Sequence, residues 1–92
     1  MLSDIPKKLE KVDKKLVDLE ILRAGIIAEL DAVSLYEQMA AITADAAIKA
    51  VLLEVAKEEK THVGEFQALL LKRDEEQVNE LEAGKKEVED LD

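Results

Sequence analysis

The sequence predicts an all-α fold in which two long helices form an antiparallel hairpin flanked by terminal helices. Of its 92 residues, 48% are hydrophobic and 38% charged, with one Phe, one Tyr and no Trp. Three Gly and one Pro interrupt a composition rich in Ala, Leu, Glu and Lys, which is typical of long helices. No segment alternates as a strand would. The length suffices for one small domain, taken as residues 1–92.

The first predicted helix begins near the N-terminus. In residues 4–19, apolar side chains recur at intervals of four and three, and Pro6 stands near the first turn. The pattern then continues without a clear stop. Because Asp13 or Asp18 could cap a new helix, the sequence leaves open whether this region is one long helix or two helices with a bend.

Two apolar stripes run along residues 21–42. One contains Glu29 in its middle, among Leu22, Ile26, Val33, Tyr36 and Ala40. The other consists of Ile21, Ala28, Ala32, Leu35, Met39 and Ile42. A helix with two such stripes is covered on more than one side, so we expect a bundle or an oligomer.

A break at Thr43-Ala44-Asp45 precedes the second long helix, and Thr43 or Asp45 can supply its N-cap oxygen. This helix is predicted to run from Ala46 to Lys72. Its stripe consists of Ile48, Leu52, Val55, Glu59, His62, Phe66 and Leu69.

The last predicted helix is short, amphipathic and acidic. Asp74 is its predicted N-cap, and Gly84 weakens its middle. Its apolar residues are Val78, Leu81, Val88 and Leu91. We interpret it as an oligomer contact or a solvated face.

The overall charge and the missing residue types exclude several classes of function. With a net charge of −9 and basic residues scattered without aromatic partners, the chain is not expected to bind nucleic acid or anionic membranes. The absence of cysteine excludes disulfides, iron–sulfur clusters and thiol catalysis. No apolar run approaches the roughly 20 residues that span a bilayer, and the N-terminus is too polar for a signal peptide. A cytoplasmic protein fits these features.

Three polar residues lie on stripes where a core would place apolar ones. With the turn near residue 44, Glu29 and Glu59 both stand about 22 Å from it, at a rise of about 1.5 Å per residue. His62, the only histidine, shares the face of Glu59, because residues i and i+3 are neighbours on a helix. The three side chains can therefore converge inside the hairpin.

Such a cluster is typical of half a metal centre. A carboxylate in an apolar core needs compensation, which a bound cation supplies. Di-iron sites in four-helix bundles use one Glu from each of two helices and Glu-x-x-His from each of the others. Two hairpins related by a two-fold axis would supply that whole set, with Glu29, Glu59 and His62 as ligands. We therefore expect a homodimer that holds two Fe, with Mn or Zn as substitutes, because oxygen-rich ligation suits Fe and Mn best.

Other interpretations of these residues stay open. His62 could be a core residue, and Glu29 could pair with Lys60 or Arg23 of another subunit. Tyr36, two turns from Glu29, could hydrogen-bond a ligand carboxylate or simply pack. Three neighbouring glutamates could be alternative ligands or a solvated face: Glu37, Glu58 and Glu65.

The segments "AELDAVSLYEQMA" and "EVAKEEKTHVGEFQALLL" resemble the encapsulated ferritins, the ferritin-like cargo of encapsulin nanocompartments, and particularly the archaeal form fused to an encapsulin shell. The resemblance covers about residues 19–91 and rests on the spacing of a Glu, thirty residues and Glu-x-x-His. It implies half-ferritin chains that dimerise around a di-iron ferroxidase centre. It also implies a ring of dimers, such as a decamer, that oxidises iron for storage inside the shell.

The resemblance places the ligands on Glu29, Glu59 and His62 and the family's nearby tyrosine on Tyr36. In some members, two acidic residues flanking the first ligand form a site where metal enters. Asp31 fits one of these positions, whereas the other is occupied by an alanine. The tail "KKEVEDLD" lacks the apolar targeting peptide of stand-alone cargo, so we expect either a shell domain following in the native gene or a protein not packaged in that way.

The sequence thus favours a ferroxidase that oxidises Fe(II) with O2 across a homodimer interface, for iron storage and detoxification within an encapsulin compartment. Its expected partners are a second copy and an encapsulin shell protein. One alternative is a rubrerythrin-like di-metal peroxidase, which would need an external reductant because the chain has no cysteine. The other is a metal-free helical oligomerisation or adaptor module.

Overall fold

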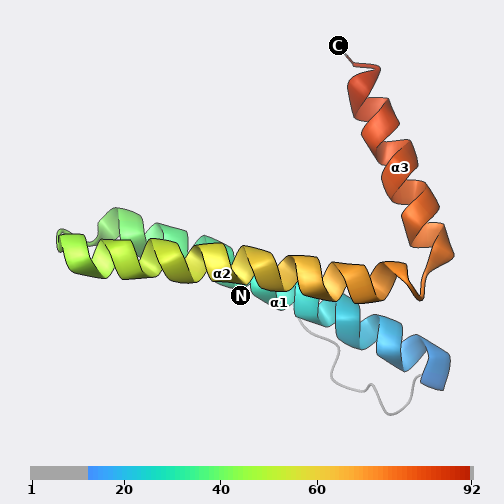
Figure 1. The fold of residues 1–92 in the computed structure, drawn as a ribbon, viewed down its shortest axis with the longest axis horizontal. Coiled ribbons are helices and arrows are strands. Elements are labelled where there is room, and N and C mark those ends of the chain that lie inside the picture. The colour runs from blue at the N-terminus through green and yellow to red at the C-terminus, as the bar shows by residue number, and fades with distance from the viewer. Residues whose placement is uncertain (1–12, 92) are drawn as a thin grey trace.

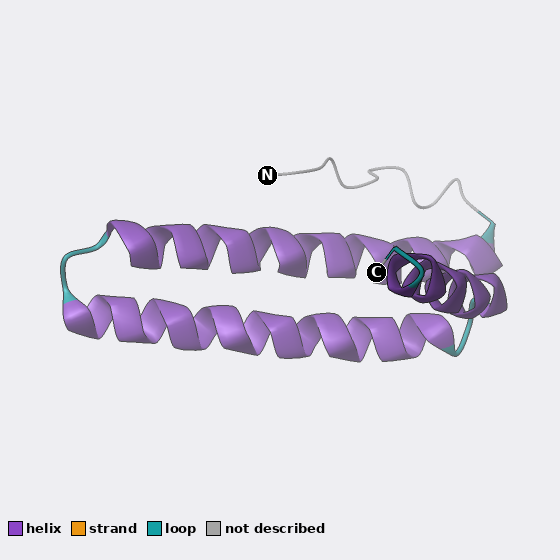
Figure 2. Ribbon diagram, turned by 90° about the horizontal axis from the view of Figure 1, so that it is seen from above, coloured by secondary structure: helices purple, strands orange, loops and turns teal. Residues whose placement is uncertain are grey.

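The computed structural model describes residues 13–91, which form three α-helices and no strand. Helix α1 spans Lys14–Ile42, α2 spans Ala46–Leu71 and α3 spans Glu75–Glu89. Helices α1 and α2 lie antiparallel, side by side, and α3 leaves the far end of α2 and points away from the hairpin (Figure 1 and Figure 2). The predicted all-α hairpin is confirmed.

Helix α1 runs without a break from Lys14 to Ile42, so no new helix begins at Asp18. The backbone carbonyl of Asp13 accepts hydrogen bonds from the amides of Leu16 and Val17, each at 2.8 Å, so Asp13 stands at the start of the helix. Asp18 lies within it. The beginning of the predicted first helix, residues 4–12, lies outside the described residues.

Aspartate caps begin the other two helices, as the sequence predicts. Asp45 Oδ1 accepts a hydrogen bond from the amide of Ile48 at 2.9 Å, so Asp45 rather than Thr43 caps α2. Asp74 Oδ1 accepts one from the amide of Gln77 at 3.0 Å and caps α3. These contacts satisfy amides that have no partner within the helix.

The core of the hairpin is thin, and it differs from the predicted one on α2. Its buried hydrophobic residues are Leu22, Ala24, Val33, Ala40, Ala56 and Leu70. On α1 these include members of the Glu29 stripe. On α2, the middle of the predicted stripe is half-buried from Leu52 to Phe66, but the fully buried residues are Ala56 and Leu70, each one position after a stripe residue. Ala56 is buried because a small side chain lets two helices approach closely.

A single protomer leaves much apolar surface uncovered. Its radius of gyration is 16.4 Å, whereas a compact chain of this length has about 12 Å. The second stripe of α1 remains exposed at Ile21, Leu35 and Ile42, the last with 82% of its surface accessible. None of the helices in residues 13–91 combines the length and the apolarity needed to cross a bilayer.

Candidate metal centre

Glu29 of α1 meets Glu59 and His62 of α2 in the interior of the hairpin. One ligand atom from each residue can be chosen so that all three lie within 4.8 Å of one another. The antiparallel pairing explains the convergence, because Glu29 and Glu59 stand at equal distances from the turn. His62 follows Glu59 by three residues and therefore projects from the same face.

The imidazole lies between the two carboxylates. His62 Nδ1 is 3.4 Å from Glu29 Oε2 and 3.5 Å from Glu59 Oε2. The side chains of Glu29 and Glu59 are only 20% and 18% exposed, whereas that of His62 is 44% exposed. The cluster thus has a shielded acidic side and an imidazole that remains accessible.

The cluster carries uncompensated negative charge when His62 is neutral. Glu29 Oε2 is buried and has no hydrogen-bond partner, since its 3.4 Å contact with His62 is within ion-pair range but is not a hydrogen bond. Two carboxylate oxygens 4.8 Å apart, the upper limit within this cluster, repel each other by about 3 kcal/mol at an effective dielectric constant of about 20. A protonated His62 would still leave the cluster with a net charge of −1, and its single Nδ1–H cannot donate well to both carboxylates. A cation bound between the three groups would compensate the charges of both carboxylates.

The donor set fits a transition-metal ion. A metal about 2.1 Å from each ligand keeps neighbouring ligand atoms about 3.0–3.4 Å apart. The distances from Nδ1 to the two carboxylates are close to this range. Two oxygen donors and one imidazole suit Fe, Mn or Zn, and the excess of oxygen favours Fe or Mn. Three protein ligands alone leave such an ion with open positions.

Tyr36 and Asp31 lie outside the three-residue cluster. Tyr36 is half-buried, and within the described part of the chain its hydroxyl makes no hydrogen bond. Asp31 is also half-buried and is not one of the grouped ligands. Their suggested roles, in supporting a ligand and in admitting metal, stay predictions.

The alternative partners of the cluster are engaged elsewhere in the protomer. Lys60 Nζ pairs with Glu37 at 3.2 Å. Arg23 pairs with Glu20 at 3.2 Å and with Asp74 at 3.0 Å. The other neighbouring glutamates, Glu58 and Glu65, are exposed and do not join the cluster. Within the protomer, neither Lys60 nor Arg23 contacts Glu29, and their pairing with Glu29 of another subunit stays an alternative.

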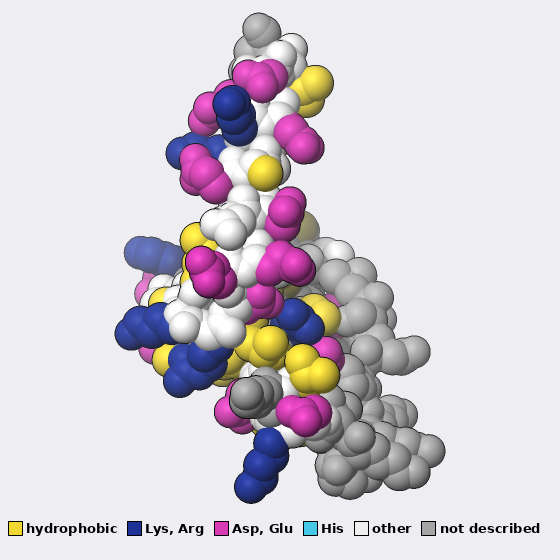
Figure 3. All heavy atoms as spheres, turned by 90° about the vertical axis from the view of Figure 1, so that its right-hand side faces the viewer, with side chains coloured by type: hydrophobic (Ala, Val, Ile, Leu, Met, Phe, Trp, Pro, Cys, Tyr) yellow, Lys and Arg dark blue, Asp and Glu magenta, His cyan; other side chains and the backbone are white. Residues whose placement is uncertain are grey.

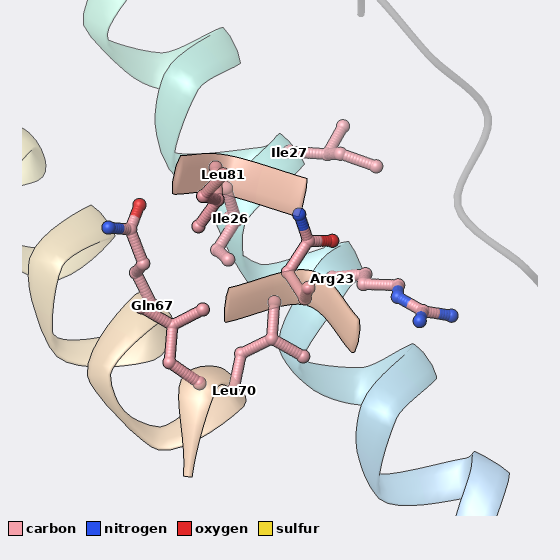
Figure 4. A pocket seen from close by; sticks show the side chains of 8 residues that line it. Arg23, Ile26, Ile27, Gln67, Leu70 and Leu81 are labelled. Carbon is pink, nitrogen blue, oxygen red and sulfur yellow. The ribbon is translucent and has the colours of Figure 1, made fainter. Parts of the chain in front are cut away.

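An apolar pocket of about 330 Å³ lies where the three helices meet, away from the cluster. Figure 4 shows Ile26 of α1, Leu70 of α2 and Leu81 of α3 around this pocket, with Arg23 at one side. The lining residues are Arg23, Ile26, Ile27, Gln67, Leu70, Leu71, Gln77 and Leu81. Because no carboxylate lines it, this pocket is not a metal site. Sequence periodicity did not predict it, since it depends on the direction in which α3 leaves α2.

Comparisons with known proteins agree with this architecture. The sequence matches the EncFtn-like family model over residues 4–84. It is 60% identical over 73 residues to a ferritin-like-encapsulin shell fusion protein of Pyrococcus furiosus, in an alignment that covers 79% of this chain and 21% of the relative. The chain therefore spans about a fifth of the length of that relative.

A solved structure with a similar fold is the crystal structure of the encapsulated ferritin domain from Pyrococcus furiosus. The two superpose with a TM-score of 0.79 at 52% identity, and the match covers 99% of this chain and 87% of the other. The match of the family model over most of the sequence, together with this likeness of fold, leads to one conclusion. The chain belongs to the EncFtn-like family.

Proposed function

We propose that this chain is half of a ferroxidase, and that two copies combine their Glu29, Glu59 and His62 to bind two Fe(II) for oxidation by O2. Family membership supports an iron-related, ferritin-like function. The observation that carries the proposal is the cluster itself, in which a buried Glu29 oxygen lacks a hydrogen-bond partner beside Glu59 and His62.

Each of the three side chains has a distinct task in this proposal. Glu29 and Glu59 supply the negative charge that holds the metal and offsets the higher charge of Fe(III). His62 binds as a neutral imidazole through Nδ1, the nitrogen turned toward both carboxylates, and this leaves Nε2 free to hydrogen-bond. Iron held there would supply the electrons that reduce O2.

A second copy of the chain would supply the missing ligands and would cover exposed apolar surface. One protomer offers three ligands, too few for two oxygen-coordinated ions, and two protomers offer six. The exposed stripe of α1 supplies an apolar surface for the contact. Such dimers would assemble further into a ring, such as a decamer. By its likeness to the encapsulin fusion protein of Pyrococcus furiosus, we also propose an encapsulin shell as partner and a cytoplasmic compartment as location.

Anaerobic Fe(II) loading followed by exposure to air tests the activity. The unmodified chain should develop Fe(III) absorbance faster than buffer alone. Glu59→Gln and His62→Ala should slow this by about tenfold or more, because each removes a ligand. Glu58→Gln, which neutralises the exposed carboxylate next in sequence, is the matched control and should behave as the unmodified chain.

An unmodified chain no faster than buffer, or a His62→Ala variant as fast as the unmodified chain, would contradict the proposal. Repeating the assay with H2O2 in place of O2 separates a ferroxidase from a peroxidase. We expect O2 to sustain the reaction without an added reductant.

A further inference from the structure

The ring of Phe66 lies against the backbone of α1 at Gly25. A Cβ built on Gly25 would stand 3.3 Å from each of three ring atoms, Cδ1, Cδ2 and Cε2. Equal distances to both sides of the ring mean that Phe66 presents its face to Gly25. Carbon atoms in ordinary contact are about 3.5–4.0 Å apart. A side chain at residue 25 would therefore require the ring, or the separation of the two helices, to give by a few tenths of an ångström.

Gly25 differs in this respect from the other two glycines. A Cβ on Gly64 or Gly84 would meet nothing within 4 Å, although both also lie inside helices. Glycine is a poor helix former, because it loses more backbone freedom on folding than any other residue. Among the three, only Gly25 has a close neighbour that explains a glycine at its position.

The contact lies one helical turn from the metal cluster. Gly25 precedes Glu29 by four residues on α1, and Phe66 follows His62 by four residues on α2. Helical side chains lean toward the N-terminus of their helix, so the Phe66 ring leans toward the turn that carries His62.

The opposite side of the cluster is also closely packed. Val33, four residues after Glu29, is 8% exposed, and Ala56, three residues before Glu59, is 2% exposed. The three ligands thus lie between a buried layer on the side of the hairpin turn and the Phe66–Gly25 contact on the other side. The first layer holds one buried residue from each helix, and in the second a side chain of α2 lies against the backbone of α1, so the second bears directly on how far apart the two helices stand.

We propose that Phe66, seated on Gly25, is a positioning residue that sets the distance from Glu29 on α1 to Glu59 and His62 on α2, and thereby the metal affinity of the centre. This inference rests on the proposed metal centre. Glu29 is the only member of the cluster on its helix, so any change in helix separation moves it relative to the other two. Metal sites tolerate ligand displacements of only about 0.5 Å.

Four variants and one spectroscopic probe test the inference. Co(II) alone is titrated into the chain, and its visible spectrum reports both affinity and coordination geometry. Gly25→Ala should weaken Co(II) binding about tenfold and change the spectrum, because the new methyl displaces the ring. Phe66→Leu should also weaken binding, because it leaves a gap over Gly25. In the double variant the methyl fills that gap, and most of the lost affinity should return.

Gly64→Ala is the matched control, and it should leave affinity and spectrum unchanged. Circular dichroism and light scattering confirm that each variant keeps its helices and its oligomeric state. If Gly25→Ala fails to fold, the Co(II) affinity of Phe66→Leu is compared with that of the double variant, and a higher affinity in the double variant supports the positioning role.

Two results would overturn the positioning role alone. One is unchanged Co(II) binding in both single variants, and the other is a loss that the double variant does not recover. Absence of Co(II) binding by the unmodified chain would instead overturn the metal centre, and the positioning role with it.

Discussion

Asp74 performs two tasks at the corner between α2 and α3. Its Oδ1 caps α3 by accepting from the Gln77 amide, and its Oδ2 pairs with Arg23 of α1 at 3.0 Å. Arg23 in turn contacts Glu20 at 3.2 Å. The start of α3 is thereby tied to α1, across 51 positions of sequence.

Substitutions at Asp74 should separate these two contributions. Asp74→Asn keeps a capping oxygen and loses the charge pair, so we expect a loss of at most about 1 kcal/mol. Asp74→Ala loses both and should cost about 1 kcal/mol more. Urea unfolding at one fixed protein concentration measures the difference, and Asp45→Ala serves as the cap-only control. Equal stability of the Asn and Ala variants would contradict the capping role.

The caps were predictable because an Asp after a helix break is a local pattern. Asp45 and Asp74 both act as the sequence indicates. The Phe66–Gly25 contact was not predicted, because it depends on the separation of two helices to a few tenths of an ångström. A helical glycine and the only phenylalanine, each one turn from a predicted ligand, were the available indications.

At the scale of elements, α3 is the least supported part of the protomer. None of its residues is buried. Figure 3 shows acidic side chains along it, with apolar ones between them. A helix of 15 residues is only marginally stable by itself in water. Its exposed Val78, Leu81 and Val88 therefore favour a contact with another chain over a fully solvated face.

We expect Val88→Lys to lower the mass of the assembly, because it places a charge in the proposed contact. Asn79→Lys adds the same charge on the opposite side of α3 and should leave the mass unchanged. Size-exclusion chromatography with light scattering measures both variants at equal concentration. Equal masses for the two variants and the unmodified chain would show that this face of α3 makes no contact.

The lengths of the helices were easier to predict than the faces they bury. The break at residues 43–45 and the span of α2 follow from local composition. Ala56 and Leu70 are the fully buried residues of α2, although the predicted stripe contained their neighbours Val55 and Leu69. The sequence could not decide between them, because both residues of each adjacent pair are apolar. Only the partner helix selects between them.

At the scale of the whole molecule, the protomer has too thin a core and too few ligands to act alone. Both deficits follow from the sequence, since the chain has few aromatic residues and a single Glu-x-x-His. The structure of one chain brings Glu29, Glu59 and His62 together. A centre with two metal ions needs the same three residues of a second copy, and their approach depends on contacts between chains. The dimeric centre therefore stays a prediction.

The most direct test is anomalous scattering at the iron absorption edge from crystals grown with Fe(II). A centre shared by two copies predicts two iron atoms per pair of chains, close to a two-fold axis and each bound by Glu29, Glu59 or His62 of the two copies. Iron located away from that axis and from His62 would contradict it.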